Sequence, residues 1–234
     1  MEKQSPLIII IVGIIVLITL FFVFTAFTGV NLFDFSEQKK ADAGQKDLNE
    51  VQGQEKEVIV NEKETEVDNV KEIVVLETSM GNIEIELNRK KAPATVENFV
   101  KYVNEGHYDG VIFHRVIKGF MIQTGNFLPS GKQKETRDPI KIESSNGLKN
   151  LKGTIAMART NEPDSATDQF FINAVDNAFL DYQSEASPGY AVFGKTISGM
   201  DIVSKIENVA TSIKGGYSDW PDENILIKKA YMKK

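Results

Sequence analysis

Residues 113–126, with the sequence FHRVIKGFMIQTGN, decide the fold of this chain. They form two short apolar runs separated at Lys118-Gly119, a pattern typical of two strands joined by a tight turn. One permanent cation, Arg115, lies inside the first run. Burying a guanidinium is costly unless it borders a cavity or has a partner. Two explanations follow: an arginine stacked on an aromatic ring, or an arginine beside a binding site.

The amino-acid composition argues against several classes of function. The chain of 234 residues is 41% hydrophobic and 26% charged, so it can bury a substantial core. It has no cysteine, which excludes thiolate chemistry, and two histidines are too few for a multi-histidine metal centre. We therefore expect no metal and no cofactor. The net charge of −6 comes entirely from residues 31–72, which hold 12 acidic residues and six lysines. The neutral remainder, without a basic stripe, argues against nucleic acid as a partner.

The amino-terminal segment predicts a membrane anchor. Residues 7–30 contain no charge, and as a helix they would extend about 36 Å, enough to cross a hydrocarbon core of about 30 Å. The run is longer than the apolar region of a cleaved signal peptide, and its only small-residue cleavage site, at residues 26–28, is weak. We predict a transmembrane anchor over residues 1–30, with the rest of the chain on the extracytoplasmic side. The polar residues 31–72 then form an acidic, largely disordered linker.

The remaining residues, 73–234, predict one mostly β domain. Alternating apolar residues indicate a hairpin over 73–87 and further strands over 153–158, 169–174, 190–195 and 225–232. A helix is expected from Pro93 to Gly106, and a second one with Ser198 as its cap. Residues 211–224 are interpreted as an irregular loop. Many short strands and only two helices favour a closed antiparallel barrel capped at its ends.

The usual arrangements for covalent catalysis are missing. The sequence has no cysteine and no serine in a Gly-x-Ser-x-Gly turn. Strand alternation places His114 opposite Arg115, which indicates a packed histidine, and His107 follows a helix end, where it can meet the last carbonyls. What remains is one fixed cation among apolar side chains and amides, at Phe120, Met121, Phe171, Phe179, Gln123 and Gln169. This set suits holding a peptide segment and does not suit breaking a covalent bond.

Several blocks resemble one family. Residues 113–125 are similar to the signature of the cyclophilin family of peptidyl-prolyl cis–trans isomerases, in its compact prokaryotic type. The blocks AMAR (156–159), DQFFIN (168–173), FLD (179–181) and YAVFGK (190–195) follow in the order and spacing of that family. The resemblance covers residues 73–234. It implies an eight-stranded antiparallel barrel with a helix at each end and a substrate groove on the outer surface.

The resemblance also implies roles for individual residues. Arg115 would be the catalytic residue. The residues that would form the substrate groove are Phe120, Met121, Gln123, Ala158, Arg159, Gln169, Phe171, Phe179, Leu180 and Tyr190. Three of them differ from the best-known eukaryotic members, which have a tryptophan at the position of Phe179, a histidine at that of Tyr190 and an asparagine at that of Arg159.

The resemblance implies a monomeric isomerase that acts on proline-containing segments of unfolded or flexible client proteins and assists their folding. The isomers of an X-Pro bond lie within about 1 kcal/mol, so the chemical problem is one of rate, and no covalent intermediate is needed. The alternative is a membrane-tethered peptide-binding module, or holding chaperone, with little turnover.

Overall fold

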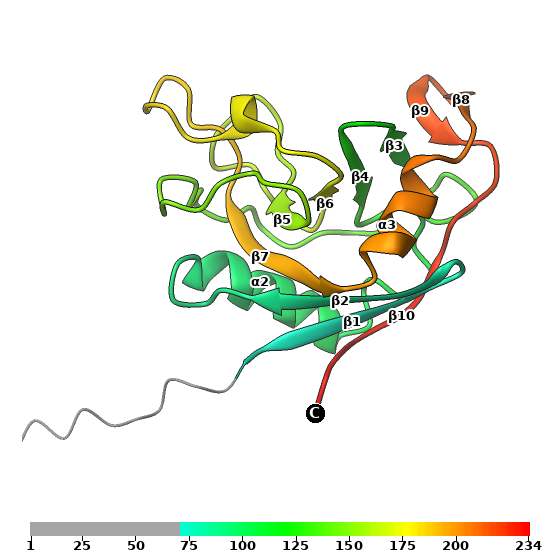
Figure 1. Cartoon of the computed structure of the whole chain (residues 1–234), viewed down its shortest axis with the longest axis horizontal. Helices are drawn as coiled ribbons and strands as arrows, with labels where there is room; N and C mark the ends of the chain where they lie inside the picture. The colour runs from blue at the N-terminus through cyan, green and yellow to red at the C-terminus, as the bar shows by residue number, and fades with distance from the viewer. Residues whose placement is uncertain (1–70) are drawn as a thin grey trace, which may run out of the picture. The chain divides into compact units, whose positions relative to one another are not determined.

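The structure is a computed structural model, and it describes residues 71–234 (Figure 1). The elements are β1 (Ile73–Thr78), β2 (Gly81–Leu87), α2 (Pro93–Asn104), β3 (Arg115–Ile117), β4 (Met121–Thr124), β5 (Thr154–Met157), β6 (Phe170–Asn173), the 3-10 turn η1 (Ala178–Leu180), β7 (Val192–Ser198), α3 (Met200–Glu207), β8 (Thr211–Lys214), β9 (Tyr217–Pro221) and β10 (Ile227–Met232). The predicted first hairpin, the two strands of residues 113–126 and the later strands are confirmed.

Eight of the strands form one antiparallel sheet in the order β10-β1-β2-β7-β5-β6-β4-β3. The sheet is an open, curled half-barrel, and the prediction of a closed barrel is met only in part. Its end strands, β3 and β10, are not neighbours in the ladder; an isolated bridge joins Ile112 to Leu226 beside them.

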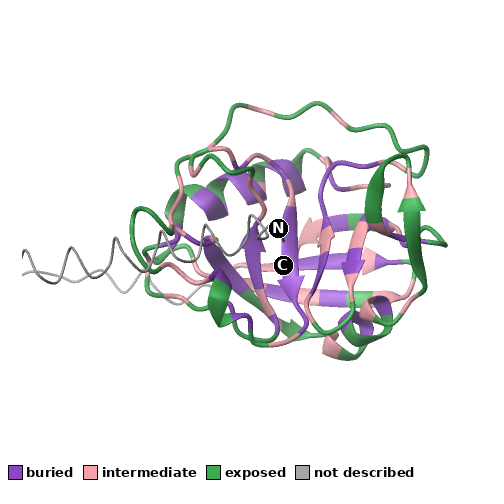
Figure 2. Cartoon of the chain, turned by 90° about the horizontal axis from the view of Figure 1, so that it is seen from above, coloured by how far each residue is buried: buried purple, intermediate pink, exposed green. Residues whose placement is uncertain are grey.

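The concave side of the sheet encloses the main core. The burial colours of Figure 2 place most buried residues on the strands and on one face of the helices. Phe99 of α2 packs against the rings of Tyr108, Phe170 and Phe193, with ring centroids 5.1–5.3 Å apart. Each such side chain contributes roughly 1.5–3 kcal/mol when it is fully buried. Phe170 and Phe193 are thus core residues.

Helix α2 begins at Pro93, the predicted first helical position. Its buried stripe includes Val96, Phe99 and Val103. The first turn is held by a carboxylate from a distant loop, because Glu143 accepts hydrogen bonds from the backbone N–H groups of Ala94 (3.1 Å) and Thr95 (2.8 Å). A negative charge at this end also complements the helix dipole.

The predicted cap of the second helix is wrong. Ser198 is the last residue of β7, and the N-cap of α3 is Gly199, whose φ is 91°. A Cβ atom at this position would lie 2.3 Å from the carbonyl oxygen of Asn82. Only glycine fits this close approach in a left-handed conformation, so backbone packing decides where the helix begins.

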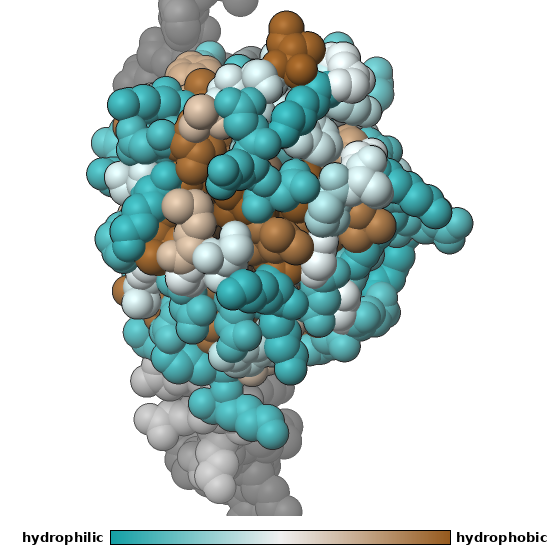
Figure 3. Space-filling model, turned by 90° about the vertical axis from the view of Figure 1, so that its right-hand side faces the viewer, coloured by the Kyte–Doolittle hydropathy of each residue, from teal (hydrophilic) through white to brown (hydrophobic). Residues whose placement is uncertain are grey.

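The prediction of an irregular loop over 211–224 is also wrong. This segment contains a hairpin, β8–β9, in which Lys214 pairs with Tyr217 across the turn Gly215-Gly216. Both glycines have positive φ, 59° and 87°, as the tight turns of hairpins require. The Gly-Gly pair was a readable turn signal that the prediction did not use. Figure 3 views the side that carries this hairpin in Figure 1, where hydrophilic residues surround a limited apolar area.

The predicted anchor over residues 1–30 and nearly all of the predicted linker lie outside the described residues. Within residues 71–234, no helix is both long and apolar enough to span a bilayer.

Candidate active site

Strand register brings the central side chains of the site into one row. Arg115 of β3 pairs with Gln123 of β4, Gln123 pairs with Phe171 of β6, and Phe171 pairs with Ala156 of β5. Directly paired residues point to the same face of a sheet. The neighbours Val116, Ile122 and Ile172 point to the opposite face and belong to the main core. Because side chains alternate between the two faces of each strand, these functional groups form a row on the convex face, separate from the core residues on the concave face.

This convex face carries a small second core. Met121, Ala156, Phe171, Leu180 and Val192 are buried there as one cluster. The cluster forms a rigid apolar floor, which positions the groups around it better than a mobile loop could.

A cavity of about 140 Å³ lies at this floor. It is lined by Arg115, Phe120, Met121, Gln123, Ala158, Arg159, Phe171, Leu180 and Tyr190. All nine belong to the groove predicted from the sequence. A dry cavity of roughly 150 Å³ accommodates a six-membered ring, so the space suits one proline ring.

The two other predicted groove residues border the cavity without lining it. Gln169 accepts a hydrogen bond from the Nε2 group of Gln123 at 2.9 Å and donates one to Asn126 at 3.2 Å. Its close approach depends on Gly125, where a Cβ atom would lie 2.5 Å from the Cα atom of Gln169. Phe179 stacks on Phe120, with ring centroids 5.6 Å apart, and remains 66% exposed at the rim.

The guanidinium of Arg115 is loosely held at the cavity wall. Its Nη1 group donates a hydrogen bond of 3.4 Å to Oε1 of Gln123, and its Nε atom lies 3.9 Å from a carboxylate oxygen of Asp219. A guanidinium locked to a carboxylate and turned away from the hollow could not serve a ligand. The ion pair here is long and partly exposed, and Arg115 lines the cavity. Asp219 is not among the predicted site residues.

Arg159 is held much more firmly. Its Nε group donates to the carbonyl of Gly189 at 2.9 Å, and its Nη1 group donates to the carbonyl of Thr160 at 2.8 Å. The guanidinium lies over the ring of Tyr190, 4.8 Å from the ring centroid. Tyr190 in turn meets Phe171 edge-on, at 5.6 Å between centroids. This end of the groove is therefore fixed by backbone carbonyls and by ring contacts among Arg159, Tyr190 and Phe171.

The histidines do not supply a general base in the groove. Burial, aided by the charge of Arg115, lowers the pKa of His114 from 6.5 to about 4. The ring packs against Phe127, with centroids 4.5 Å apart, which confirms the prediction of a packed histidine. His107 was expected to meet helix carbonyls, but its Nε2 atom lies 2.7 Å from the buried carboxylate of Asp168. Sequence spacing gave no signal for this pair, which is 61 residues apart.

No metal site is apparent in the described part of the chain, where no group of three or more His, Cys, Asp or Glu residues is placed to hold an ion. A fixed cation beside an apolar hollow, with amide groups along one wall, defines a peptide-binding groove on a curled antiparallel sheet. Such a groove can hold a proline-containing segment and act on its conformation without covalent chemistry.

The family follows from two findings. The family model of the cyclophilin type peptidyl-prolyl cis-trans isomerases matches residues 73–232. Peptidyl-prolyl cis-trans isomerase A of Dickeya dadantii is 56% identical over 157 residues, which cover 67% of this chain and 82% of that protein. Peptidyl-prolyl cis-trans isomerase B of Escherichia coli is 52% identical over 158 residues, covering 67% and 96%. This chain belongs to the cyclophilin family, and it is a peptidyl-prolyl cis–trans isomerase.

Solved structures agree with this fold. A cyclophilin type isomerase of Cryptosporidium parvum superposes with a TM-score of 0.61 at 29% identity, over 70% of this chain and 99% of that one. The same protein in the presence of the dipeptide Ala-Pro gives a TM-score of 0.60 at 30% identity, over 69% and 99%.

Proposed function

We propose that Arg115 is the catalytic residue and acts by electrostatic stabilisation of a twisted prolyl amide. Resonance gives the planar peptide bond a rotation barrier of about 18–20 kcal/mol. Halfway through rotation the nitrogen loses this resonance and regains a lone pair. A fixed cation beside the nitrogen then interacts more strongly than in either planar isomer, so it lowers the barrier. The guanidinium can also donate to the prolyl carbonyl.

The other groove residues bind the substrate in this proposal. Phe120, Met121, Phe171 and Leu180 surround the proline ring, and Phe179 covers it from the rim. Gln123 orients Arg115, and Gln169 supports Gln123 through the hydrogen bond between their amides. The extended chain at Ala158 and Arg159, with Tyr190 beside it, offers backbone groups to the peptide. The observation that carries the proposal is the row Arg115–Gln123–Phe171 beside a cavity of about 140 Å³.

The test is a protease-coupled isomerisation assay on an Ala-Pro peptide, with the full chain in detergent. We expect Arg115→Ala to lower kcat/KM at least about 100-fold, which corresponds to about 2.7 kcal/mol of transition-state stabilisation. The matched control is Arg89→Ala, which removes an arginine that pairs with Glu72 and does not line the cavity. Equal rates for wild type and Arg115→Ala would refute the catalytic assignment.

A second experiment separates an isomerase from a holding chaperone. A client whose refolding is limited by proline isomerisation should refold faster in the presence of the wild-type chain. A module that only binds the peptide would slow refolding, because it sequesters unfolded client. The Arg115→Ala variant should not accelerate refolding.

We also propose a finer architecture, in which the half-barrel closes. Backbone hydrogen bonds support it: the N–H of Phe113 donates to the carbonyl of Ile225 (2.9 Å), and that of Ile227 donates to the carbonyl of Val111 (2.8 Å). Slow amide hydrogen exchange at Phe113 and Ile227 would agree with closure, and rapid exchange at both would contradict it.

For the amino-terminal part we propose residues 1–30 as a transmembrane anchor, 31–72 as a linker and 73–234 as a monomeric isomerase domain on the extracytoplasmic side. The uncharged run of 24 residues supports the anchor. As a flexible coil, the linker would place the domain roughly 35–40 Å from the bilayer. Protease added to intact cells should release the domain; protection of the domain until the membrane is broken would contradict the orientation.

A further inference from the structure

The hairpin β8–β9 lies next to the strand that carries Arg115. Figure 1 shows β9 beside β3, although the two are about a hundred residues apart in the sequence. The side chain of Asp219, in β9, reaches Arg115 with one carboxylate oxygen 3.9 Å from Nε. The hairpin therefore borders the active site through Arg115, although none of its residues lines the cavity of about 140 Å³.

Two pairs of consecutive residues face each other across this contact. On β9, Trp220 is 5% exposed and packs against Phe127 and His114, with ring centroids 5.3 Å and 6.1 Å apart. The partly exposed charged pair lies next to this aromatic contact, because Asp219 directly precedes Trp220 and Arg115 directly follows His114. The buried aromatic pair thus fixes the register in which the charged pair meets.

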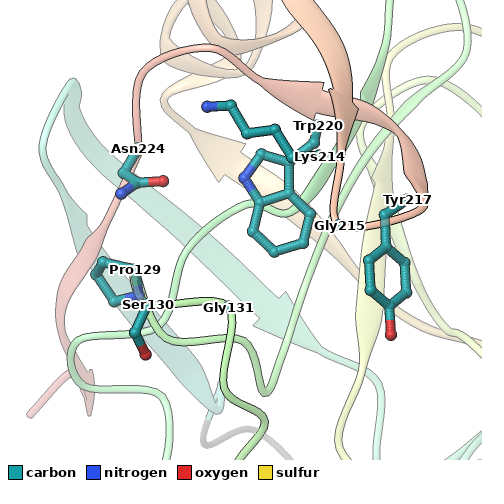
Figure 4. A pocket seen from close by; sticks show the side chains of 8 residues that line it. All are labelled: Pro129, Ser130, Gly131, Lys214, Gly215, Tyr217, Trp220 and Asn224. Atoms are coloured by element: carbon teal, nitrogen blue, oxygen red, sulfur yellow. The ribbon is translucent and has the colours of Figure 1, made fainter.

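A lysine side chain on β8 holds the base of the hairpin. Lys214 donates from Nζ to the carbonyl oxygens of Pro221 (2.8 Å) and Asp222 (2.7 Å). Lys214 and Trp220 both line a cavity of about 400 Å³ at the hairpin (Figure 4). These bonds hold the backbone on the carboxyl side of Asp219.

The backbone at Asp219 is strained. Its φ is 58°, and within residues 71–234 it is the one residue other than glycine with a positive φ. This left-handed conformation costs roughly 1–2 kcal/mol for most residues and less for aspartate and asparagine. Such strain persists where the surrounding structure enforces it, and it is common at functional sites. Here the turn in the backbone lets Trp220 point into the protein while Asp219 points towards Arg115.

We propose that Asp219 is a positioning residue for Arg115, an inference that rests on the proposed catalytic role of that arginine. Gln123 accepts a hydrogen bond from Nη1 at 3.4 Å, and the carboxylate of Asp219 lies 3.9 Å from Nε, where it acts through its charge. Two oxygens from different strands thereby bias the orientation of a guanidinium that remains loosely held. Among the described residues, Nη2 has no protein partner and is free for the substrate. The side chains of Arg115 and Asp219 are 43% and 38% exposed, so their ion pair adds little to stability, and its effect is on orientation.

The first test is Asp219→Asn, because asparagine tolerates the left-handed backbone and removes only the charge. We expect kcat to fall about fivefold while KM and the melting temperature stay unchanged. Asp219→Gly relieves the strain and should lose kcat equally at an equal or higher melting temperature. Glu223→Gln is the matched control, because it makes the same change of charge at an exposed position that does not line the active-site cavity.

Two further measurements separate positioning from structure. The Nε–H signal of Arg115 in a nitrogen–proton NMR spectrum should shift in Asp219→Asn and stay unchanged in Glu223→Gln. In an Arg115→Ala background, Asp219→Asn should have no further effect on kcat.

The outcomes also distinguish this inference from the proposed function. If Arg115→Ala loses activity but Asp219→Asn keeps the wild-type kcat, positioning by Asp219 is refuted and the role of Arg115 stands. A rise of kcat in Asp219→Asn also refutes it, because the carboxylate would then merely weaken the cation. If Arg115→Ala retains the wild-type rate, the proposed function fails and the inference fails with it.

Discussion

The two arginines of the groove line the same cavity but are held in opposite ways. Arg159 donates to two backbone carbonyls at 2.8–2.9 Å and stacks on Tyr190. Within the described part of the chain, the partners of Arg115 are two side-chain oxygens, at 3.4 Å and 3.9 Å. A guanidinium whose donors are taken up by the backbone connects loops, whereas a loosely held one keeps donors for a ligand. In the proposed assignment, the same residue type serves as a structural bracket at one end of the groove and as the reactive group at the other.

The largest effect should come from exchanging each arginine for lysine. Lysine keeps the charge but loses the planar fork of donors. We expect Arg115→Lys to lower kcat/KM about 100-fold, because orientation at the amide is lost. Arg159→Lys should change kcat/KM less than about threefold, since the catalytic group is untouched. The protease-coupled assay measures both.

Melting temperatures provide the control for this pair. Arg159→Lys should lower the melting temperature more than Arg115→Lys, because it breaks bonds to the carbonyls of Gly189 and Thr160. Similar kinetic losses in the two variants would show that the contrast between bracket and reactive group is wrong.

The next largest effect is the pH dependence of stability that arises from His114, the residue before Arg115 in the sequence. Burial lowers the pKa of His114 to about 4 from 6.5, so the unfolded chain binds more protons between these values. Stability is therefore fully present above pH 6.5 and is lost as the pH falls towards 4. We expect the free energy of unfolding to decrease by about 2 kcal/mol from pH 7 to pH 5 through this group.

Denaturant unfolding at several pH values measures this loss. The variant His114→Gln should lack this part of the pH dependence, while other titrating groups keep theirs. An NMR titration of the His114 ring checks the pKa directly. A ring that titrates near 6.5 in the folded chain would contradict the prediction.

Sequence reasoning identified the groove because its residues come from short, ordered blocks. Residues 113–126 place Arg115, Phe120, Met121 and Gln123 within nine positions. Strand alternation separates Arg115, Met121 and Gln123 from the main core, and Phe120 lies in the turn before β4. Register between strands was not readable, because the pairing of Gln123 with Phe171 depends on how distant strands assemble. Periodicity predicts which face of its strand each side chain occupies. Which side chains lie next to one another on neighbouring strands is seen only in the assembled sheet.

The parts that sequence reasoning missed depend on backbone geometry and long-range contact. Asp219 reaches Arg115 because its φ is positive, and aspartate is compatible with either sign of φ. Gly199 replaces Ser198 as the cap because of the carbonyl of Asn82, more than a hundred positions away. The hairpin β8–β9 was missed for another reason: its strands are short and polar, so the alternation of apolar residues was absent.

The smallest effect should come from the aromatic rim near Arg115. Phe179 is 66% exposed and contacts Phe120 by stacking, so it can cover a bound proline but cannot orient the guanidinium. We expect Phe179→Ala to raise KM about threefold with kcat unchanged, because it removes binding that is equal in ground and transition states. Phe179→Trp, which keeps the stacked ring, should leave KM within about twofold of the wild type. A loss of kcat in Phe179→Ala would mean that the rim also positions Arg115, and the division between a reactive cation and a passive binding wall would need to be redrawn.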